Sequence, residues 1–170
     1  MIVNKAYRYR IYPTTEQKMM FAKTFGCVRF IYNKMLSDRI DYYKETGQKL
    51  NNTPAQYKEE FPWLKEVDSL ALANAQMNLN KAYSHFWNDS QHFGKPRFKS
   101  KKNRRASYST NNQKGSVRIE GHKVKLPKVG WVKLCQHRPL PENSIIISLS
   151  LLPELSIESS MIPPLKIVPK

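Results

Sequence analysis

Almost half of the basic side chains of this 170-residue chain lie in one segment, between Phe93 and Arg138. The segment holds fourteen of the 29 Lys and Arg residues and a single acid, Glu120. No apolar core needs such a density of cations, and their mutual repulsion opposes a compact fold. We therefore expect the segment to lie at the surface against an anionic partner. Its densest stretch, GKPRFKSKKNRRASYST, mixes cations with aromatic rings and hydroxyls, which is typical of surfaces that hold a sugar-phosphate backbone.

The excess positive charge is confined to that segment, although the whole chain has a formal net charge of +16. Residues 1–92 carry thirteen basic and nine acidic side chains, and residues 139–170 carry two basic and three acidic ones. A Lys-rich run is often no more than a solvated surface. Here Phe98 and Tyr108 interrupt the run, which favours a binding surface over that alternative.

Other features exclude several classes of protein. Cys27 and Cys135 form no C-x-x-C pair, so neither a zinc site nor a disulfide framework is expected. The polar N-terminus MIVNKAYRYR does not resemble a signal peptide, and no apolar run of about eighteen residues predicts a membrane span. We expect a protein of the cytoplasm, associated with the nucleoid, that needs no metal, cofactor or small-molecule substrate.

The hydrophobic pattern predicts an α+β fold. Residues 3–12 alternate as a strand, with Arg8 and Arg10 on one face. Short strands are also predicted at 106–110, 116–120, 123–126 and 130–134. Strands at this spacing are typical of a small barrel or curled sheet, which the N-terminal strand would complete.

Three helices are predicted between these strands, as a helical insert. The first begins at a capping box formed by Thr14 and Gln17 and ends at Gly26. The second covers about 27–46, and two helices joined at a glycine suggest a helix-turn-helix. The third covers about 68–88, where apolar residues keep helical spacing.

The side chains that we expect to contact nucleic acid share a few kinds of chemistry. Cations neutralise phosphates, and Arg pairs with phosphate or guanine through two hydrogen bonds. Hydroxyls donate to phosphate, rings stack on bases, and helical Asn and Gln side chains pair with adenine edges. Phe98 and Tyr108 could equally anchor a strand in the core. The candidates are Arg8, Arg10, Asn33, Asn74, Gln76, Asn78, Lys95, Arg97, Phe98, Lys99, Lys101, Lys102, Arg104, Arg105, Ser107, Tyr108, Thr110, Lys125, Lys133 and Arg138.

The chemistry of hydrolysis is hard to find in this sequence. A metal-dependent nuclease gathers acidic side chains from the ends of strands. Here the acids cluster in the helical region, and among the predicted strands only Glu120 is acidic. No catalytic residue is assigned. A stand-alone small nuclease or transposase with its own active site is the alternative.

Five blocks follow one another between residues 5 and 141: YRYRIYPTTEQ, FGCVRFIYNKML, LALANAQMNLNKAYSHFW, GKPRFKSKKNRRASYST and VKLPKVGWVKLCQHRPLP. In this order they resemble the N-terminal half of the TnpB (OrfB) proteins of bacterial insertion sequences. Full-length members of that family are RNA-guided DNA endonucleases. Cleavage in them belongs to a later RuvC-like domain, which the resemblance does not reach.

The resemblance implies a division of the chain. Residues 1–13 and 94–141 would form an oligonucleotide-binding-like wedge barrel. Residues 14–93 would form a three-helix recognition insert, with a helix-turn-helix region within 1–46. Beyond Pro141 the sequence departs from the family and resembles out-of-frame translation, so residues 142–170 are expected to be an irregular tail.

The sequence thus predicts a nucleic-acid-binding fragment of a transposon-associated protein. It would bind guide-type RNA, transposon-end DNA or both, without nuclease activity. An unrelated basic RNA-binding protein is a further alternative. The apolar stretch 145–152 would favour aggregation if its backbone were left unpaired.

Overall fold

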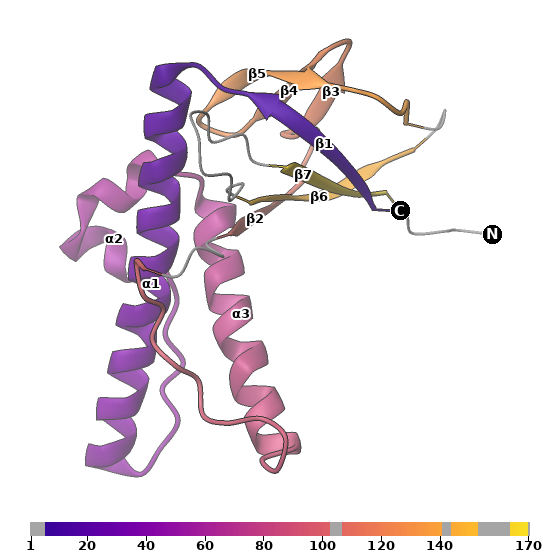
Figure 1. The fold of residues 1–170 in the computed structure, drawn as a ribbon. Coiled ribbons are helices and arrows are strands. Elements are labelled where there is room, and N and C mark those ends of the chain that lie inside the picture. The colour runs from indigo at the N-terminus through magenta and orange to yellow at the C-terminus, as the bar shows by residue number, and fades with distance from the viewer. Residues whose placement is uncertain (1–5, 103–106, 141–143, 153–163, 170) are drawn as a thin grey trace. The chain divides into compact units, whose positions relative to one another are not determined.

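The computed structural model describes residues 6–102, 107–140, 144–152 and 164–169. The chain divides into two compact units: a sheet unit of residues 1–25 and 104–170, and a helical unit of residues 26–103 (Figure 1). The elements in chain order are β1 (Tyr7–Tyr12), α1 (Thr15–Thr46), α2 (Tyr57–Glu60), the 3-10 helix η1 (Pro62–Glu66), α3 (Ser69–Asn88), β2 (Tyr108–Asn111), β3 (Arg118–Glu120), β4 (Lys123–Leu126), β5 (Gly130–Cys135), β6 (Ile146–Leu151) and β7 (Pro164–Pro169). The mixture of helices and strands confirms the predicted α+β class.

The sheet unit is built on seven antiparallel strands in the order β2-β6-β7-β1-β5-β4-β3. Because successive side chains of a strand point to opposite faces, alternation sorts them into a buried and an exposed set. On the buried face, the ring of Phe25 from α1 meets the ring of Tyr108 edge-on, with 5.2 Å between the centroids. The buried apolar strand residues are Tyr9, Ile11, Tyr108, Val124, Leu126, Val132, Leu134, Leu149 and Leu151.

The sheet is open, so the prediction of a closed wedge-type barrel is wrong for the described strands. β2 and β3 stand at the two ends of the hydrogen-bonded order and do not pair with each other. These end strands have only four and three residues. Strands that short offer few backbone groups for closing a barrel, which also requires a consistent tilt and stagger of all strands.

The prediction of an irregular tail is also wrong, because two of the seven strands lie beyond residue 142. β6 pairs with β2 and β7, and β7 also pairs with β1. The apolar stretch that contains β6 buries Leu149 and Leu151 completely. Its backbone is hydrogen-bonded on both sides, and this pairing removes the exposed edge that favours aggregation.

The predicted boundary between two helices at Gly26 is wrong, since α1 runs without interruption from Thr15 to Thr46. Buried Cys27, Val28 and Ile31 continue the helical spacing past the glycine. Their burial outweighs the cost of about 1 kcal/mol that glycine carries relative to alanine inside a helix. The helix ends before Gly47, whose φ of +70° suits a residue without a side chain.

The predicted capping box at Thr14 and the predicted third helix are both confirmed. In the capping box, the Thr14 amide donates to Gln17 Oε1 at 3.0 Å, and the Gln17 amide donates to Thr14 Oγ1 at 3.3 Å. α3 covers 69–88, and the Asp68 carboxylate caps it by accepting from the Leu70 amide at 3.1 Å.

A buried asparagine holds the irregular segment after α1 to the rest of the helical unit. Asn52, only 3% exposed, donates from Nδ2 to the Met35 carbonyl at 3.2 Å and to the Tyr57 hydroxyl at 2.8 Å. Its Oδ1 accepts from Arg39 Nε at 2.7 Å, and its carbonyl accepts from Gln76 Nε2 at 3.1 Å. These bonds join the segment to α1, α2 and α3, and they satisfy polar groups that would otherwise be buried without a partner.

No helix in the described part of the chain is both long and apolar enough to cross a membrane.

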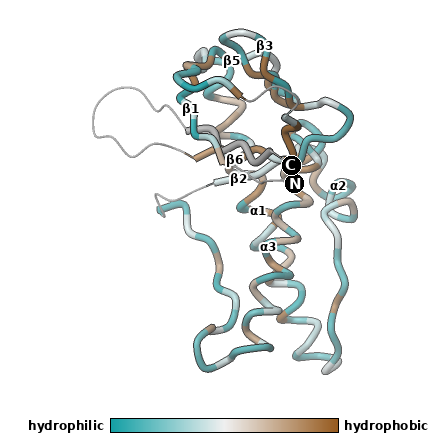
Figure 2. The backbone as a smooth tube through the Cα atoms, turned by 90° about the vertical axis from the view of Figure 1, so that its right-hand side faces the viewer, coloured by the Kyte–Doolittle hydropathy of each residue, from teal (hydrophilic) through white to brown (hydrophobic). Residues whose placement is uncertain are grey.

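The segment between α3 and β2 is strongly hydrophilic along its described length (Figure 2).

Candidate nucleic-acid interface

The exposed side of the sheet gathers cations from four neighbouring strands. Strand register places them on one face, because directly paired residues in an antiparallel sheet point the same way. Lys123 lies opposite Lys133, Lys125 opposite Arg118, and Arg8 and Arg10 share this face two residues apart on β1. We call this set the basic face; it consists of Arg8, Arg10, Arg118, Lys123, Lys125 and Lys133.

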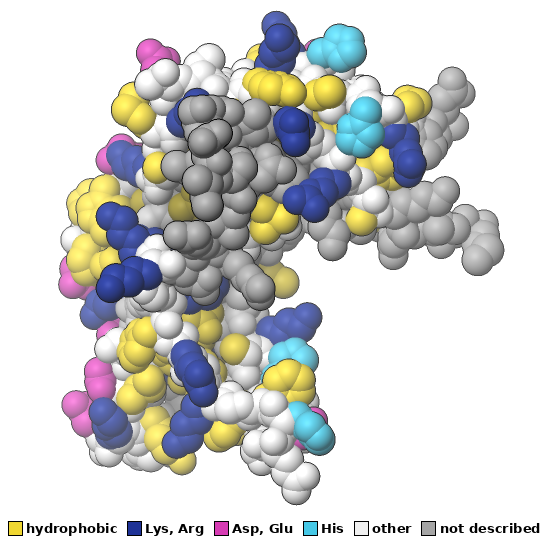
Figure 3. Space-filling view, in the orientation of Figure 1, with side chains coloured by type: hydrophobic (Ala, Val, Ile, Leu, Met, Phe, Trp, Pro, Cys, Tyr) yellow, Lys and Arg dark blue, Asp and Glu magenta, His cyan; other side chains and the backbone are white. Residues whose placement is uncertain are grey.

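The basic face carries a net positive charge, because its six cations share one acid among β3, β4 and β5. Glu120 is the one acid of β3, β4 and β5. It lies opposite Lys123 in the strand register, and its Oε1 lies 2.9 Å from Nε of Arg118. Lys123 and Lys133 stand directly opposite each other, an arrangement that destabilises a sheet by itself. In Figure 3, Lys and Arg side chains recur over the strands, whereas Asp and Glu side chains gather mainly over the helices. An anionic partner would relieve the repulsion between the cations.

Two aromatic rings lie among these cations. Trp131 pairs with Lys125 in the strand register and is 36% exposed, and the guanidinium carbon of Arg118 lies 5.4 Å from the centre of its ring. Tyr12, opposite Lys133, is 41% exposed. Exposed rings between cations offer stacking surfaces beside phosphate contacts, as surfaces that bind single-stranded nucleic acid do.

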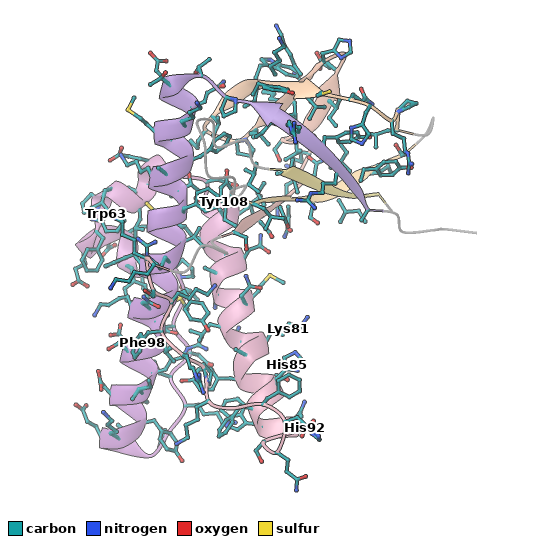
Figure 4. The ribbon with its side chains drawn as sticks, viewed as in Figure 1. Trp63, Lys81, His85, His92, Phe98 and Tyr108 are labelled. Carbon is teal, nitrogen blue, oxygen red and sulfur yellow. The ribbon has the colours of Figure 1, made fainter. Side chains whose placement is uncertain are left out.

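Residues 94–102 are the part of the Lys- and Arg-rich segment that lies in the helical unit, and we call them the basic stretch. One asparagine of α1 holds this stretch. Asn33 donates from Nδ2 to the Lys99 carbonyl at 2.9 Å, and its Oδ1 accepts from the Lys99 amide at 2.8 Å. The Lys99 ammonium lies 4.2 Å from the centre of the Tyr32 ring, and its partial desolvation there lowers the pKa of Lys99. Phe98 was predicted either to stack on a base or to anchor a strand in the core. It is 58% exposed, so it does not lie in a core (Figure 4).

The remaining candidates are dispersed. Lys95, Arg97, Lys101 and Lys102 are exposed on the segment after α3, and Asn78 is exposed on α3. Asn74 Nδ2 donates to the Leu70 carbonyl at 2.9 Å, and Gln76 Nε2 donates to the Asn52 carbonyl at 3.1 Å. Arg104 and Arg105, at the centre of the predicted basic run, lie outside the described residues.

Candidates at the start of β2 and after β5 lie in the sheet unit. Tyr108 and Thr110 are buried on the core side of β2, so Tyr108 takes the core position that the sequence left open. Ser107 is exposed before β2. Arg138 is exposed, and its carbonyl accepts from the Tyr9 hydroxyl at 2.6 Å.

Four residues of this surface were not among the sequence-based candidates: Tyr12, Arg118, Lys123 and Trp131. The signal for Lys123 was available, since it shares a strand face with Lys125 at a spacing of two. Arg118 and Trp131 could be joined to that face only through the pairing of β3, β4 and β5.

Acidic and metal-binding chemistry is sparse in the same region. Among the residues that the structure describes, no three His, Cys, Asp or Glu side chains come together to hold a metal ion. Neither Cys27, which is buried, nor Cys135, which is exposed, is part of a disulfide.

The sequence also matches known proteins. A model described as a helix-turn-helix domain, of the OrfB type found in insertion sequences, matches residues 1–48, the stretch that contains β1 and α1. The virulence protein VsdF of Salmonella dublin is 34% identical over 113 residues, which cover 57% of this chain and 93% of that protein. The chain belongs to the OrfB (TnpB) family of insertion-sequence proteins.

Two longer relatives of this OrfB-family chain carry the name "Putative RNA-guided DNA endonuclease". One, from Streptomyces pristinaespiralis, is 36% identical over 112 residues, which cover 62% of this chain and 27% of the relative. The other, InsQ from Escherichia coli strain K12, is 24% identical over 138 residues, which cover 76% of this chain and 33% of InsQ. The chain thus spans about a quarter to a third of the length of these two relatives.

Proposed function

We propose that this OrfB-family chain is a nucleic-acid-binding module of a transposon-associated protein. Its basic face holds the phosphates of guide-type RNA, transposon-end DNA or both, and the chain itself performs no cleavage. Its place of action is the cytoplasm, at the nucleoid. The observation that carries the proposal is the alignment of six cations from β1, β5, β4 and β3 on one side of the sheet.

The distribution of charge on the two sides of the sheet supports this function over a purely structural role. The buried side forms the core, so it accounts for folding without the opposite side. Directly opposed lysines such as Lys123 and Lys133 reduce stability, and a chain that needed the sheet only as a scaffold would gain from a neutral pair there. The exposed cations therefore point to an anionic ligand.

The proposal predicts a steep dependence of binding on salt. If each of the six cations neutralises one phosphate of duplex DNA, a plot of log K against log salt concentration should fall with a slope of about −5. The measurement is fluorescence anisotropy of the full chain with a labelled duplex and with a labelled RNA hairpin at several salt concentrations. Affinity that is unchanged between low and moderate salt on both ligands would contradict the proposal.

The alternative of a stand-alone nuclease has its own test. Pure protein incubated with supercoiled plasmid and Mg²⁺ or Mn²⁺ should leave the plasmid supercoiled, because hydrolysis assisted by metal ions needs gathered carboxylates. A preparation with the basic-face residues Arg8, Lys123 and Lys133 changed to Gln serves as the control for contaminating nucleases. Nicking that copurifies with the unchanged chain and is lost in this variant would identify an enzyme.

A further inference from the structure

A cavity of about 710 Å³ lies within the helical unit, apart from the basic face. Its walls come from the C-terminal turns of α1, the segment after α1, the C-terminal half of α3 and the start of the basic stretch. This volume falls in the range of roughly 300–1,000 Å³ that is usual for sites of small ligands. Its cationic and aromatic lining residues include Arg39, Tyr43, Lys49, Tyr83, Trp87 and Lys95.

The cavity lining is positively charged and contains no carboxylate. Four cations line it, and one of them, Lys44, already pairs with Asp41 outside the lining at 3.4 Å. Arg39 donates to two neutral amide oxygens, Asn52 Oδ1 at 2.7 Å and Asn80 Oδ1 at 2.8 Å. Within the described part of the chain no carboxylate pairs with Arg39, Lys49 or Lys95. The charge of the site therefore complements an anion.

The same lining presents aromatic faces. Tyr83 and Trp87, one helical turn apart on α3, stack with 5.2 Å between ring centroids and an interplanar angle of 28°. Trp87 is 53% exposed and Tyr43 is 60% exposed, so part of each ring is open to a ligand. The Lys49 ammonium lies 3.9 Å from the centre of the Trp87 ring. An exposed cation held over a ring by this contact alone can move to a phosphate, which forms a stronger charge-assisted hydrogen bond.

We propose that this cavity takes one unpaired nucleotide of a single-stranded nucleic acid. The base stacks on Trp87 or Tyr43, and the flanking phosphates lie against Lys49 and Lys95. Stacking surfaces next to unpaired cations match a nucleotide in both of its parts, the flat base and the anionic linkage. Duplex DNA does not fit this description, because its bases are already stacked and paired.

Tryptophan fluorescence tests the proposal directly. The chain has three Trp residues, so the double variant Trp63→Phe, Trp131→Phe leaves Trp87 as the single reporter. An oligothymidylate or oligouridylate of about ten nucleotides, within the usual site sizes, should quench Trp87 in a saturable manner. In the full chain, Trp87→Ala should weaken binding of the same oligonucleotides roughly 5- to 150-fold.

Charge variants provide the matched control. Lys49→Gln with Lys95→Gln should weaken binding about 25-fold at 0.1 M salt, since each phosphate contact on a single strand contributes a slope of about 0.7. Lys81→Gln should change little, because Lys81 is exposed on α3 outside the cavity lining and projects away from α1 (Figure 4). Equal losses in log K per removed charge in the cavity and Lys81 variants would overturn the assignment.

Two further outcomes would also contradict this site. If free adenosine monophosphate quenches Trp87 as strongly as the oligonucleotides do, the cavity is a site for mononucleotides and not for a nucleotide within a single strand. Quenching by an acidic peptide, with none by the oligonucleotides, would indicate a protein partner. The site lies in a different unit from the basic face, so loss of duplex binding in basic-face variants leaves this test unaffected.

Discussion

Replacing Arg8, Lys123 and Lys133 together with Gln is expected to weaken binding of duplex DNA about 500-fold at 0.1 M salt. Each phosphate contact contributes about 0.9 to the slope of log K against log salt, so three contacts contribute about 2.7 log units between 1 M and 0.1 M salt. The slope should fall by the same 2.7, to about half of its original value. Anisotropy titrations of the triple variant over the salt range used for the unchanged chain measure both quantities.

The matched control changes three exposed cations of the same unit that are not on the basic face. Lys18 lies on α1, Lys114 in the turn after β2, and Lys128 in the turn between β4 and β5. Their replacement with Gln removes the same net charge. If both triple variants lose the same affinity and slope, only total charge matters and the basic face is not the interface.

Replacing Asn52 with Ala is expected to destabilise the helical unit by about 3–5 kcal/mol. Three side-chain hydrogen bonds disappear, one of them to the Arg39 guanidinium, and bonds to charged groups are the stronger kind. The Tyr57 hydroxyl would lose a donor inside the unit and the Arg39 Nε–H would lose its acceptor. Chemical denaturation followed by far-ultraviolet circular dichroism, which reports the loss of α1 and α3, measures the change.

Asn51 provides the comparison for this variant, since it is adjacent in sequence but exposed. Asn51→Ala should change stability by less than about 0.5 kcal/mol, as surface substitutions usually do. The Asn52 variant should in addition loosen the wall of the cavity, because Lys49, Leu50 and Asn51 precede this anchor directly. Equal stability of the two variants would mean that the hydrogen bonds around Asn52 contribute little in solution.

The buried side of the sheet stabilises the fold, and we assign binding to the exposed side. The core side would suffice for a stable antiparallel sheet, and the exposed side adds repulsion that a scaffold does not need. Chains under selection for binding commonly accept such a loss, because a protein needs to stay only somewhat above its stability threshold. Binding of a polyanion to the folded state would return stability in proportion to the logarithm of ligand concentration.

Local sequence signals determined much of this structure. The alternation of β1 placed Tyr9 and Ile11 inside and Arg8 outside, and the capping box at Thr14 and the start of α3 at Asp68 follow the expected chemistry. β4 was predicted at its observed bounds, and the five ordered blocks identified the family. These features depend on contacts between residues a few positions apart, which a sequence displays directly.

The features that only the tertiary structure decided all depend on partners distant in the chain. Gly26 stays helical because burial of its neighbours outweighs its propensity, and β6 and β7 form because β2 and β1 offer them free strand edges. Arg118 joins Lys125 through pairing across strands, and Asn52 becomes an anchor through Arg39 and Tyr57. The sequence could show that cations were abundant. Which of them share one surface was settled by strand register, whose energy comes from long-range packing that no local pattern contains.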